Sequence, residues 1–151
     1  MFAPPFRFRL ERVRVLRETR EEVAKAQLAA AMSKLSASQD RLRVADEQLA
    51  KANAEHRSAT DSGGLSGVDL IAAQAFLEQV EQQRWQGALE RRRSESEVAH
   101  RGAELGHAAR EHKALQRLKE RHRAEHQRES ARRESQALDE IAVGRFRGNA
   151  A

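Results

Sequence analysis

Between residues 10 and 140, several turn-forming residues cluster at only one place, the run Asp-Ser-Gly-Gly-Leu-Ser-Gly at residues 61–67. Gly63 and Gly64 can adopt the positive φ angles that end a helix and reverse the chain. Ser66, followed three residues later by Asp69, offers an N-cap and a short variant of the capping box for the next segment. Both flanks have the composition of long helices, so the sequence predicts one helical hairpin: a helix over about 6–62, a turn at 63–66 and a second helix over about 67–147.

Composition separates this hairpin from a compact domain. Charged residues make up 34% of the 151 residues and aromatic residues only 4%, so too few large apolar side chains are present for a globular core. This composition is typical of coiled coils, although high charge is also a mark of intrinsic disorder. There is no cysteine, which excludes disulfides and thiolate chemistry. No apolar run approaches the ~18 residues that span a bilayer.

A heptad pattern decides in favour of the coiled coil. Leucines recur every seven residues, and a small residue follows each leucine three places later: Leu28, Leu35, Leu42 and Leu49, with Ala31, Ser38, Ala45 and Ala52. Such a seam lets a partner helix approach closely. We therefore expect an all-α fold, a long antiparallel two-helix coiled-coil hairpin with its turn near residues 62–66.

Mirror pairing supports the antiparallel arrangement. If the chain reverses at about residue 65, partners in the two helices should have residue numbers that sum to about 131. The expected apolar pairs are Leu49 with Val80, Leu42 with Leu89, Leu35 with Val98, Leu16 with Leu115 and Val13 with Leu118. A parallel dimer would give no reason for this relation.

The same reasoning predicts that the second helix is longer than its partner. Pro4 and Pro5 exclude a helix at the start and predict an extended lead over residues 1–5. Residues 126–147 then have no partner within the hairpin. Beyond a highly polar stretch, an apolar stripe returns at Leu138, Ile141, Ala142 and Phe146, which favours docking onto another protein. The alternative is that this end folds back onto Phe6 and Phe8.

Three glycines lie inside the second helix, Gly87, Gly102 and Gly106. Each costs about 0.8–1 kcal/mol of helix stability relative to alanine. The spacing of Gly102 and Gly106 suggests close packing against the alanine-rich face of the first helix.

The sequence offers little for catalysis. His122, Glu125 and His126 match the HxxEH pattern of some zinc proteases. Such an enzyme needs a third ligand and a water-excluding cleft, which a two-helix hairpin does not provide. We expect solvated side chains there, no catalytic residue, no metal and no cofactor.

Arginines are concentrated at the start of the chain. Six of them, Arg7, Arg9, Arg12, Arg14, Arg17 and Arg20, face only Glu11 and Glu18 in that segment, and the whole chain carries a net charge of +5. A basic stripe of this kind can bind nucleic acid, an anionic lipid surface or an acidic protein. Because acidic and basic residues are mixed over the rest of the chain, we do not expect nucleic acid to be the main ligand.

Three stretches resemble the flagellar FliJ family, a small component of the bacterial type III export apparatus. They are FRFRLERVRVLRE at residues 6–18 with Glu21, Glu22, Ala24 and Leu28; Gln74, Phe76, Leu77 and Val80 after the turn; and Leu138, Ile141 and Ala142 with Arg145 and Phe146 near the end. Ala73 and Arg84 depart from the resemblance, because many members carry an aromatic or aliphatic residue there.

The resemblance implies a non-catalytic cytoplasmic stalk at the inner face of the membrane at the flagellar base. Its implied partners are the hexameric flagellar export ATPase, the cytoplasmic domain of the export gate, and export chaperones, with membrane association only peripheral, through the apparatus. The equivalent stalk of a virulence secretion system is an open alternative. The residues and the resemblance together give these candidate partner-binding residues: Phe6, Phe8, Arg9, Arg12, Phe76, Leu77, Val80, Leu138, Ile141 and Phe146. Trp85 is a further candidate, although packing is the more common role of a tryptophan on a coiled coil.

Overall fold

The computed structural model describes residues 4–149, and within this range it contains two α-helices and no strand. Helix α1 spans Glu11–Asp61 and helix α2 spans Gly67–Asn149. The contacts divide into two units. We call Val23–Gly106 the leucine unit, and residues 4–22 with 107–149 the charged unit. In each unit a segment of α1 pairs with a segment of α2, which confirms the all-α helical hairpin.

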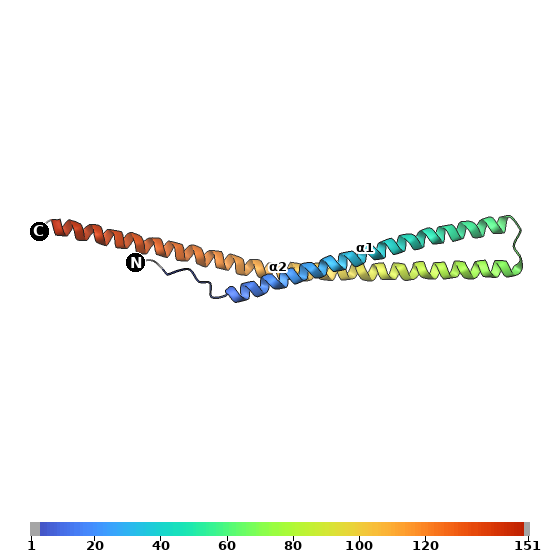
Figure 1. Cartoon of the computed structure of the whole chain (residues 1–151), viewed down its shortest axis with the longest axis horizontal. Coiled ribbons are helices and arrows are strands. Elements are labelled where there is room, and N and C mark those ends of the chain that lie inside the picture. The colour runs from blue at the N-terminus through green and yellow to red at the C-terminus, as the bar shows by residue number, and fades with distance from the viewer. Residues whose placement is uncertain (1–3, 150–151) are drawn as a thin grey trace. The chain divides into compact units, whose positions relative to one another are not determined.

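In the leucine unit, α1 and α2 run antiparallel from the turn (Figure 1). The buried positions on α1 are Ala24, Ala31, Ser38 and Ala52, whereas the leucines of the repeat are half-buried. Because the partner helix covers these leucines only in part, the small residues define the closest approach of the two helices. Ser38 is fully buried, and its Oγ donates a hydrogen bond to the Leu35 carbonyl at 2.9 Å.

Ion pairs across the seam establish the register of the leucine unit. Arg41 Nη2 lies 2.5 Å from Glu90 Oε1, and Arg84 Nε lies 2.6 Å from Asp46 Oδ1. The residue numbers of these pairs add to 131 and 130. The mirror pairing predicted from the sequence is therefore confirmed in this unit.

The turn follows the predicted chemistry with one correction. Helix α1 ends at Asp61, and Gly63 has a φ of 67°, but Gly64 does not share the positive φ expected of both glycines. Ser66 caps α2 as predicted: its Oγ accepts a hydrogen bond from the Asp69 amide at 3.2 Å, and its own amide donates to Asp69 Oδ2 at 3.4 Å.

Two of the glycines inside α2, Gly87 and Gly102, are not explained by close packing. A Cβ built on Gly102 would have no neighbour within 4 Å, so the expected tight approach at this position is wrong. At Gly87 a Cβ would lie 3.7 Å from Leu42 Cδ1, which is ordinary van der Waals contact. Neither position requires the absence of a side chain.

In the charged unit the predicted apolar pairs of α1 do not form. Leu16 is 50% exposed and Val13 is 40% exposed, whereas Arg14, Arg17 and Glu21 occupy the half-buried positions. The heptad repeat explains why charged residues occupy the seam here. Counting backwards from Ala24 in alternating steps of three and four residues reaches Glu21, Arg17 and Arg14, not Leu16 or Val13. The predictions that paired Leu16 with Leu115 and Val13 with Leu118 were therefore wrong.

The first helix begins at Glu11 rather than near residue 6. Residues 4–8 are not helical, and the Glu11 amide donates to the Phe8 carbonyl at 3.2 Å as the helix starts. The proline pair excludes a helix interior only at residues 4 and 5, whereas Phe6 and Phe8 lie in the lead with their rings against His126 and His122 of α2. The part of the expected lead at residues 1–3 lies outside the described residues.

The non-helical lead shortens the unpaired part of α2. Phe8 contacts the His122 ring, and Phe6 contacts the His126 ring, with centroids 5.9 and 5.7 Å apart. An extended chain rises about 3.3 Å per residue and a helix about 1.5 Å, so two residues of the lead match four residues of α2. Residues 126–130 thus are not wholly unpartnered as expected, whereas every side chain from 131 to 148 is exposed.

Candidate functional site

No metal centre is formed by the HxxEH pattern. Among residues 4–149, no group of three His, Cys, Asp or Glu side chains is arranged to hold a metal ion. His122 and His126 instead lie on the face of α2 that carries the N-terminal lead, where Phe8 and Phe6 pack against their rings. The arrangement favours structural roles for both histidines.

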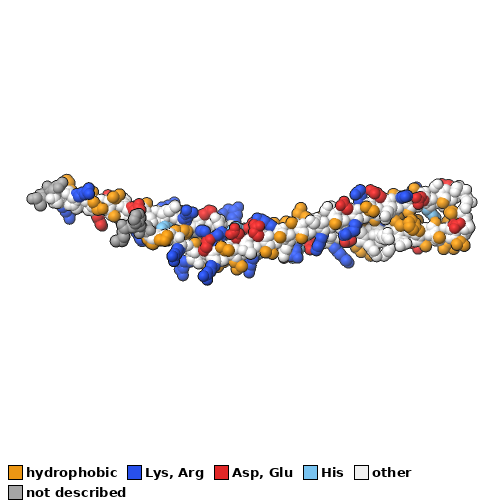
Figure 2. Space-filling model, in the orientation of Figure 1, with side chains coloured by type: hydrophobic (Ala, Val, Ile, Leu, Met, Phe, Trp, Pro, Cys, Tyr) orange, Lys and Arg blue, Asp and Glu red, His pale blue; other side chains and the backbone are white. Residues whose placement is uncertain are grey.

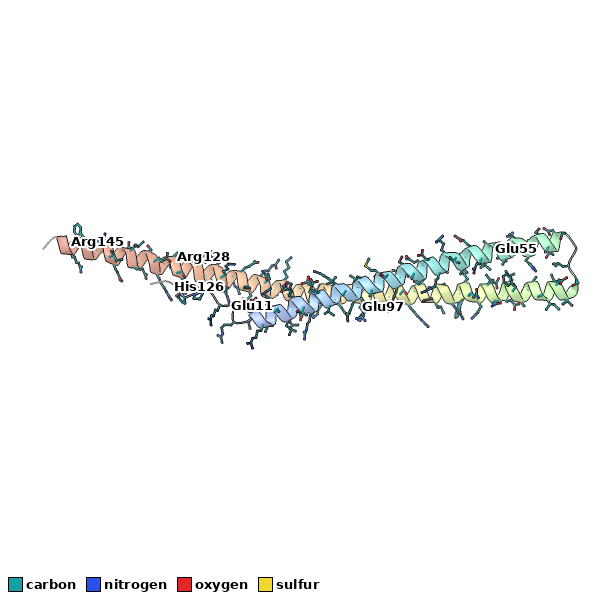
Figure 3. The ribbon with its side chains drawn as sticks, viewed as in Figure 1. Glu11, Glu55, Glu97, His126, Arg128 and Arg145 are labelled. Atoms are coloured by element: carbon teal, nitrogen blue, oxygen red, sulfur yellow. The ribbon has the colours of Figure 1, made fainter. Side chains whose placement is uncertain are left out.

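Phe6 and Phe8 were predicted as partner-binding residues, and they differ in what they present. Phe8 is 9% exposed and belongs to the small core of the charged unit. Phe6 is half-buried and keeps part of its ring accessible beside His126, which Figure 3 labels on α2. Any partner that reaches this end of the lead would meet Phe6 rather than Phe8.

A carboxylate and two cations hold the start of α1 against α2. Arg14 Nη2 lies 2.7 Å from Glu11 Oε1, and Lys119 Nζ lies 2.9 Å from Glu11 Oε2. The hydrogen bond from Arg14, followed by that from Lys119, lowers the pKa of Glu11 from 4.5 to about 2. Glu11 (Figure 3) is therefore a charged link between the two helices of this unit.

Two further polar contacts continue the seam of the charged unit. Arg17 Nη1 lies 2.5 Å from Glu111 Oε2, and Glu21 Oε2 lies 2.6 Å from His112 Nδ1. The other ring nitrogen of His112 is buried without a hydrogen-bond partner among the described residues. Sequence reasoning missed this polar seam because it searched for apolar pairs, although the leucine repeat extended backwards would have located it.

Phe76, Leu77 and Val80 lie near the start of α2 in the leucine unit. Val80 is buried and Leu77 is half-buried, so both pack against α1, whereas Phe76 is 56% exposed. Phe76 and Val80 line a hollow of about 350 Å³, together with Gln48, Lys51, Ala52, Glu55, Gln79 and Gln83. Trp85 is also 56% exposed and does not line this hollow. Of Phe76, Leu77 and Val80, only Phe76 is exposed enough to contact a partner.

The apolar stripe near the end of α2 is exposed. Leu138, Ile141 and Phe146 are 66%, 54% and 80% exposed. The fold-back alternative is not what the structure shows, because Phe6 and Phe8 pack on His126 and His122 instead. Large apolar side chains that stay exposed together commonly mark a binding surface.

Arg9 and Arg12 were also predicted to bind a partner. Both side chains are exposed, and within the described part of the chain neither forms an ion pair. Arg12 lies in the first turn of α1, and Arg9 lies just before that helix.

The described residues define an architectural class of protein. They form a two-helix coiled coil in which several large apolar side chains are exposed. No helix within residues 4–149 has a stretch long and apolar enough to cross a membrane.

The comparison with family models identifies the family. Residues 6–151 match the model described as the flagellar FliJ protein, which is nearly the whole chain. The chain belongs to the flagellar FliJ protein family, and it is therefore a component of flagellar type III export. No curated protein and no solved structure matches the chain.

Proposed function

We propose that this chain is a non-catalytic, stalk-like coupling factor that links the flagellar export ATPase to the cytoplasmic domain of the export gate and escorts export chaperones. It would act in the cytoplasm, peripheral to the inner face of the cell membrane at the flagellar base. Membership of the FliJ family supports the setting. The observation that carries the proposal is a two-helix coiled coil whose α2 also bears an apolar stripe left exposed by the other described residues.

The stripe is suited to a protein partner because of its composition and its accessibility. Leu138, Ala142 and Phe146 follow one another at steps of four residues, and Ile141 lies three residues after Leu138, so together they form one broad side of α2. Full burial of an exposed side chain of this size contributes about 1.5–3 kcal/mol, which is the upper limit for each of these partly exposed residues in a partner groove. Arg133 and Glu129, an ion pair one to two turns earlier, support the helix that carries the stripe.

Phe76 supports a second contact in the leucine unit. Its ring stands exposed beside a hollow, which is the arrangement of an aromatic anchor and an adjoining pocket. Arg84, which departs from the family pattern, is held by Asp46 across the seam and would contribute to the coiled coil rather than to a partner. We propose that the stripe near the end of α2 and the hollow beside Phe76 bind different partners. Which partner binds which surface is left open.

The experiment compares two sets of three apolar side chains. Leu138, Ile141 and Phe146 are changed together to serine, and the matched control changes Val68, Leu70 and Ile71, which are also exposed, to serine. We expect only the first set to abolish the effect of the purified chain on the activity or assembly of the export ATPase, and to abolish motility in cells. Equal losses with both sets, or no loss with the first, would contradict the assignment of this stripe.

Crosslinking in cells identifies the partners directly. Photo-reactive probes at Arg12, Phe76 and Ile141 report on three separate exposed positions. We expect Phe76 and Ile141 to capture export-apparatus proteins. Capture of injectisome subunits instead would assign the chain to a virulence secretion system.

A further inference from the structure

The outer side of α1 in the charged unit carries arginines and aliphatic side chains without a carboxylate between them. Arg12, Leu16 and Arg20 follow one another at steps of four residues, and Val13 lies three residues before Leu16, so these four residues share one side of α1. Arg9 lies in the turn just before the helix begins. That side is turned away from the seam, since Arg14 and Arg17 are the half-buried residues. We call these five residues the outer arginine face.

The arginines of this face are not neutralised within the chain. The segment from residue 4 to residue 20 holds only two carboxylates, Glu11 and Glu18. Arg14 binds both of them, and Lys119 also binds Glu11. No ion pair in the described part of the chain involves Arg7, Arg9, Arg12 or Arg20, so their charge is left for a ligand.

The aliphatic side chains add a second property to the face. Val13 is 40% and Leu16 is 50% exposed, and Leu10 and Val15 nearby are exposed to a similar extent. They remain outside because the repeat places charged residues in the seam. Figure 2 shows blue and orange side chains mixed where α1 begins. The result is a basic amphipathic surface.

We infer that the outer arginine face binds the surface of an anionic phospholipid bilayer. Guanidinium groups pair with lipid phosphates, and their aliphatic stems can lie along apolar surface while the charged ends remain in water. Val13 and Leu16 would enter the boundary between headgroups and acyl chains, as on helices that lie in the plane of a membrane. The ligand class is the anionic headgroup in a bilayer.

Other ligands fit this face less well. A protein hot spot is commonly built on Trp, Tyr or Arg, with Leu and Val under-represented, and this face has no aromatic residue because Phe8 is buried and Phe6 lies against His126. Single-stranded nucleic acid needs aromatic stacking platforms, and duplex phosphates would leave Val13 and Leu16 in water. The combination of free arginines and exposed aliphatic residues favours a lipid surface.

The test uses the purified full chain and needs no export component, so its outcome is separate from that of the proposed function. Cosedimentation is measured with vesicles of phosphatidylglycerol and phosphatidylcholine, and with vesicles of phosphatidylcholine alone. We expect binding only to the anionic vesicles and a decrease as salt is raised. Neutralising one arginine near an anionic surface weakens binding by about fivefold, so the triple variant Arg9→Gln, Arg12→Gln, Arg20→Gln should weaken it by roughly a hundredfold.

A charge-matched control places the same change elsewhere in the charged unit. Arg128, Arg132 and Arg147 on α2 are exposed and form no ion pair among the described residues. Their change to Gln should alter vesicle binding by less than about fivefold, while Val13→Ser with Leu16→Ser should weaken it at unchanged charge. Helicity is measured for every variant.

Three results would overturn the inference. The first is equal binding to neutral vesicles, and the second is an equal loss of binding in the control triple variant. The third is an absence of vesicle binding by the wild-type chain under conditions where it binds duplex DNA or an acidic protein.

Discussion

The leucine unit and the charged unit use one spacing of seam residues with two different chemistries. In the leucine unit Ala31 and Ser38 are buried on α1, and the leucines beside them fill the remaining space. In the charged unit the equivalent positions hold Arg17 and Glu21, which reach Glu111 and His112 on α2. The spacing of three and four residues thus sets which side of a helix faces its partner, and the side chains at those positions set how strongly that contact is held.

A substitution that overpacks the seam of the leucine unit should give the largest change in stability. Ala31 is 1% exposed, so Ala31→Leu forces extra atoms into the closest approach of the two helices. We expect a loss of about 1–3 kcal/mol in the free energy of unfolding, measured by chemical denaturation. The control Ala30→Leu, at an exposed position, should change stability by less than about 0.5 kcal/mol. Equal losses would mean that the small residues do not limit the packing.

A substitution at Gly102 tests helix propensity separately from packing. Because a Cβ there meets nothing within 4 Å, Gly102→Ala should stabilise the chain by about 0.8–1 kcal/mol. Gly63→Ala is the opposite case, since its φ of 67° strains any residue with a side chain, and it should destabilise the turn. Thermal unfolding measures both. A destabilising Gly102→Ala would show that the helices approach more closely than the structure has them.

A double-mutant cycle measures the strength of the charged seam. Arg17 and Glu111 are each about one-third exposed, at 29% and 32%, so solvent screens their attraction. We expect a coupling free energy of about 0.2–1 kcal/mol from Arg17→Ala, Glu111→Ala and the double variant, determined by chemical denaturation. Raising the salt concentration should reduce this coupling. A coupling above about 2 kcal/mol would contradict the view that this seam is weakly held.

Glu11 provides the smallest and most local test. Its lowered pKa means that the ionised carboxylate favours the folded state, so its contribution is complete above pH 4.5 and is lost as pH falls towards 2. An NMR titration of the Glu11 carboxyl should give a value near 2. Arg14→Gln should raise the pKa more than Lys119→Gln, because the hydrogen bond from Arg14 is the larger cause. A value near 4.5 in the wild-type chain would remove this link.

The sequence predicted the parts of the fold that depend on local or periodic signals. The turn, the Ser66 cap and the pairing of Arg41 with Glu90 follow from residue type and from counting. Predictions failed where apolar character was given more weight than spacing, as at Leu16. Because α1 is one continuous helix, turning Leu16 into the seam would turn the later leucines out of it. The charged residues that occupy the seam instead are compensated by their ion pairs with α2.

The candidate surfaces were predictable in position but not in exposure. All three predicted phenylalanines, Phe6, Phe8 and Phe76, are apolar candidates in the sequence, yet only Phe76 is more than half exposed. The contacts of Phe6 and Phe8 depend on the extended lead, whose direction follows from how far non-helical residues reach along α2. No periodic signal encodes that reach, so the structure was needed to separate the accessible ring from the buried one.

The location of the one turn has a consequence for synthesis. Paired residues are separated by 38 positions at Asp46 and Arg84 and by 94 positions at Arg17 and Glu111. As the polypeptide leaves the ribosome, α1 emerges before α2 and has no partner helix until α2 has been synthesised. Contacts close to the turn can then form earliest, and each one shortens the span that the next must close. The arginine-rich start of α1 is made before the rest of that helix but finds its partner last, and a newly made molecule therefore exposes that segment for longer than any other part of α1.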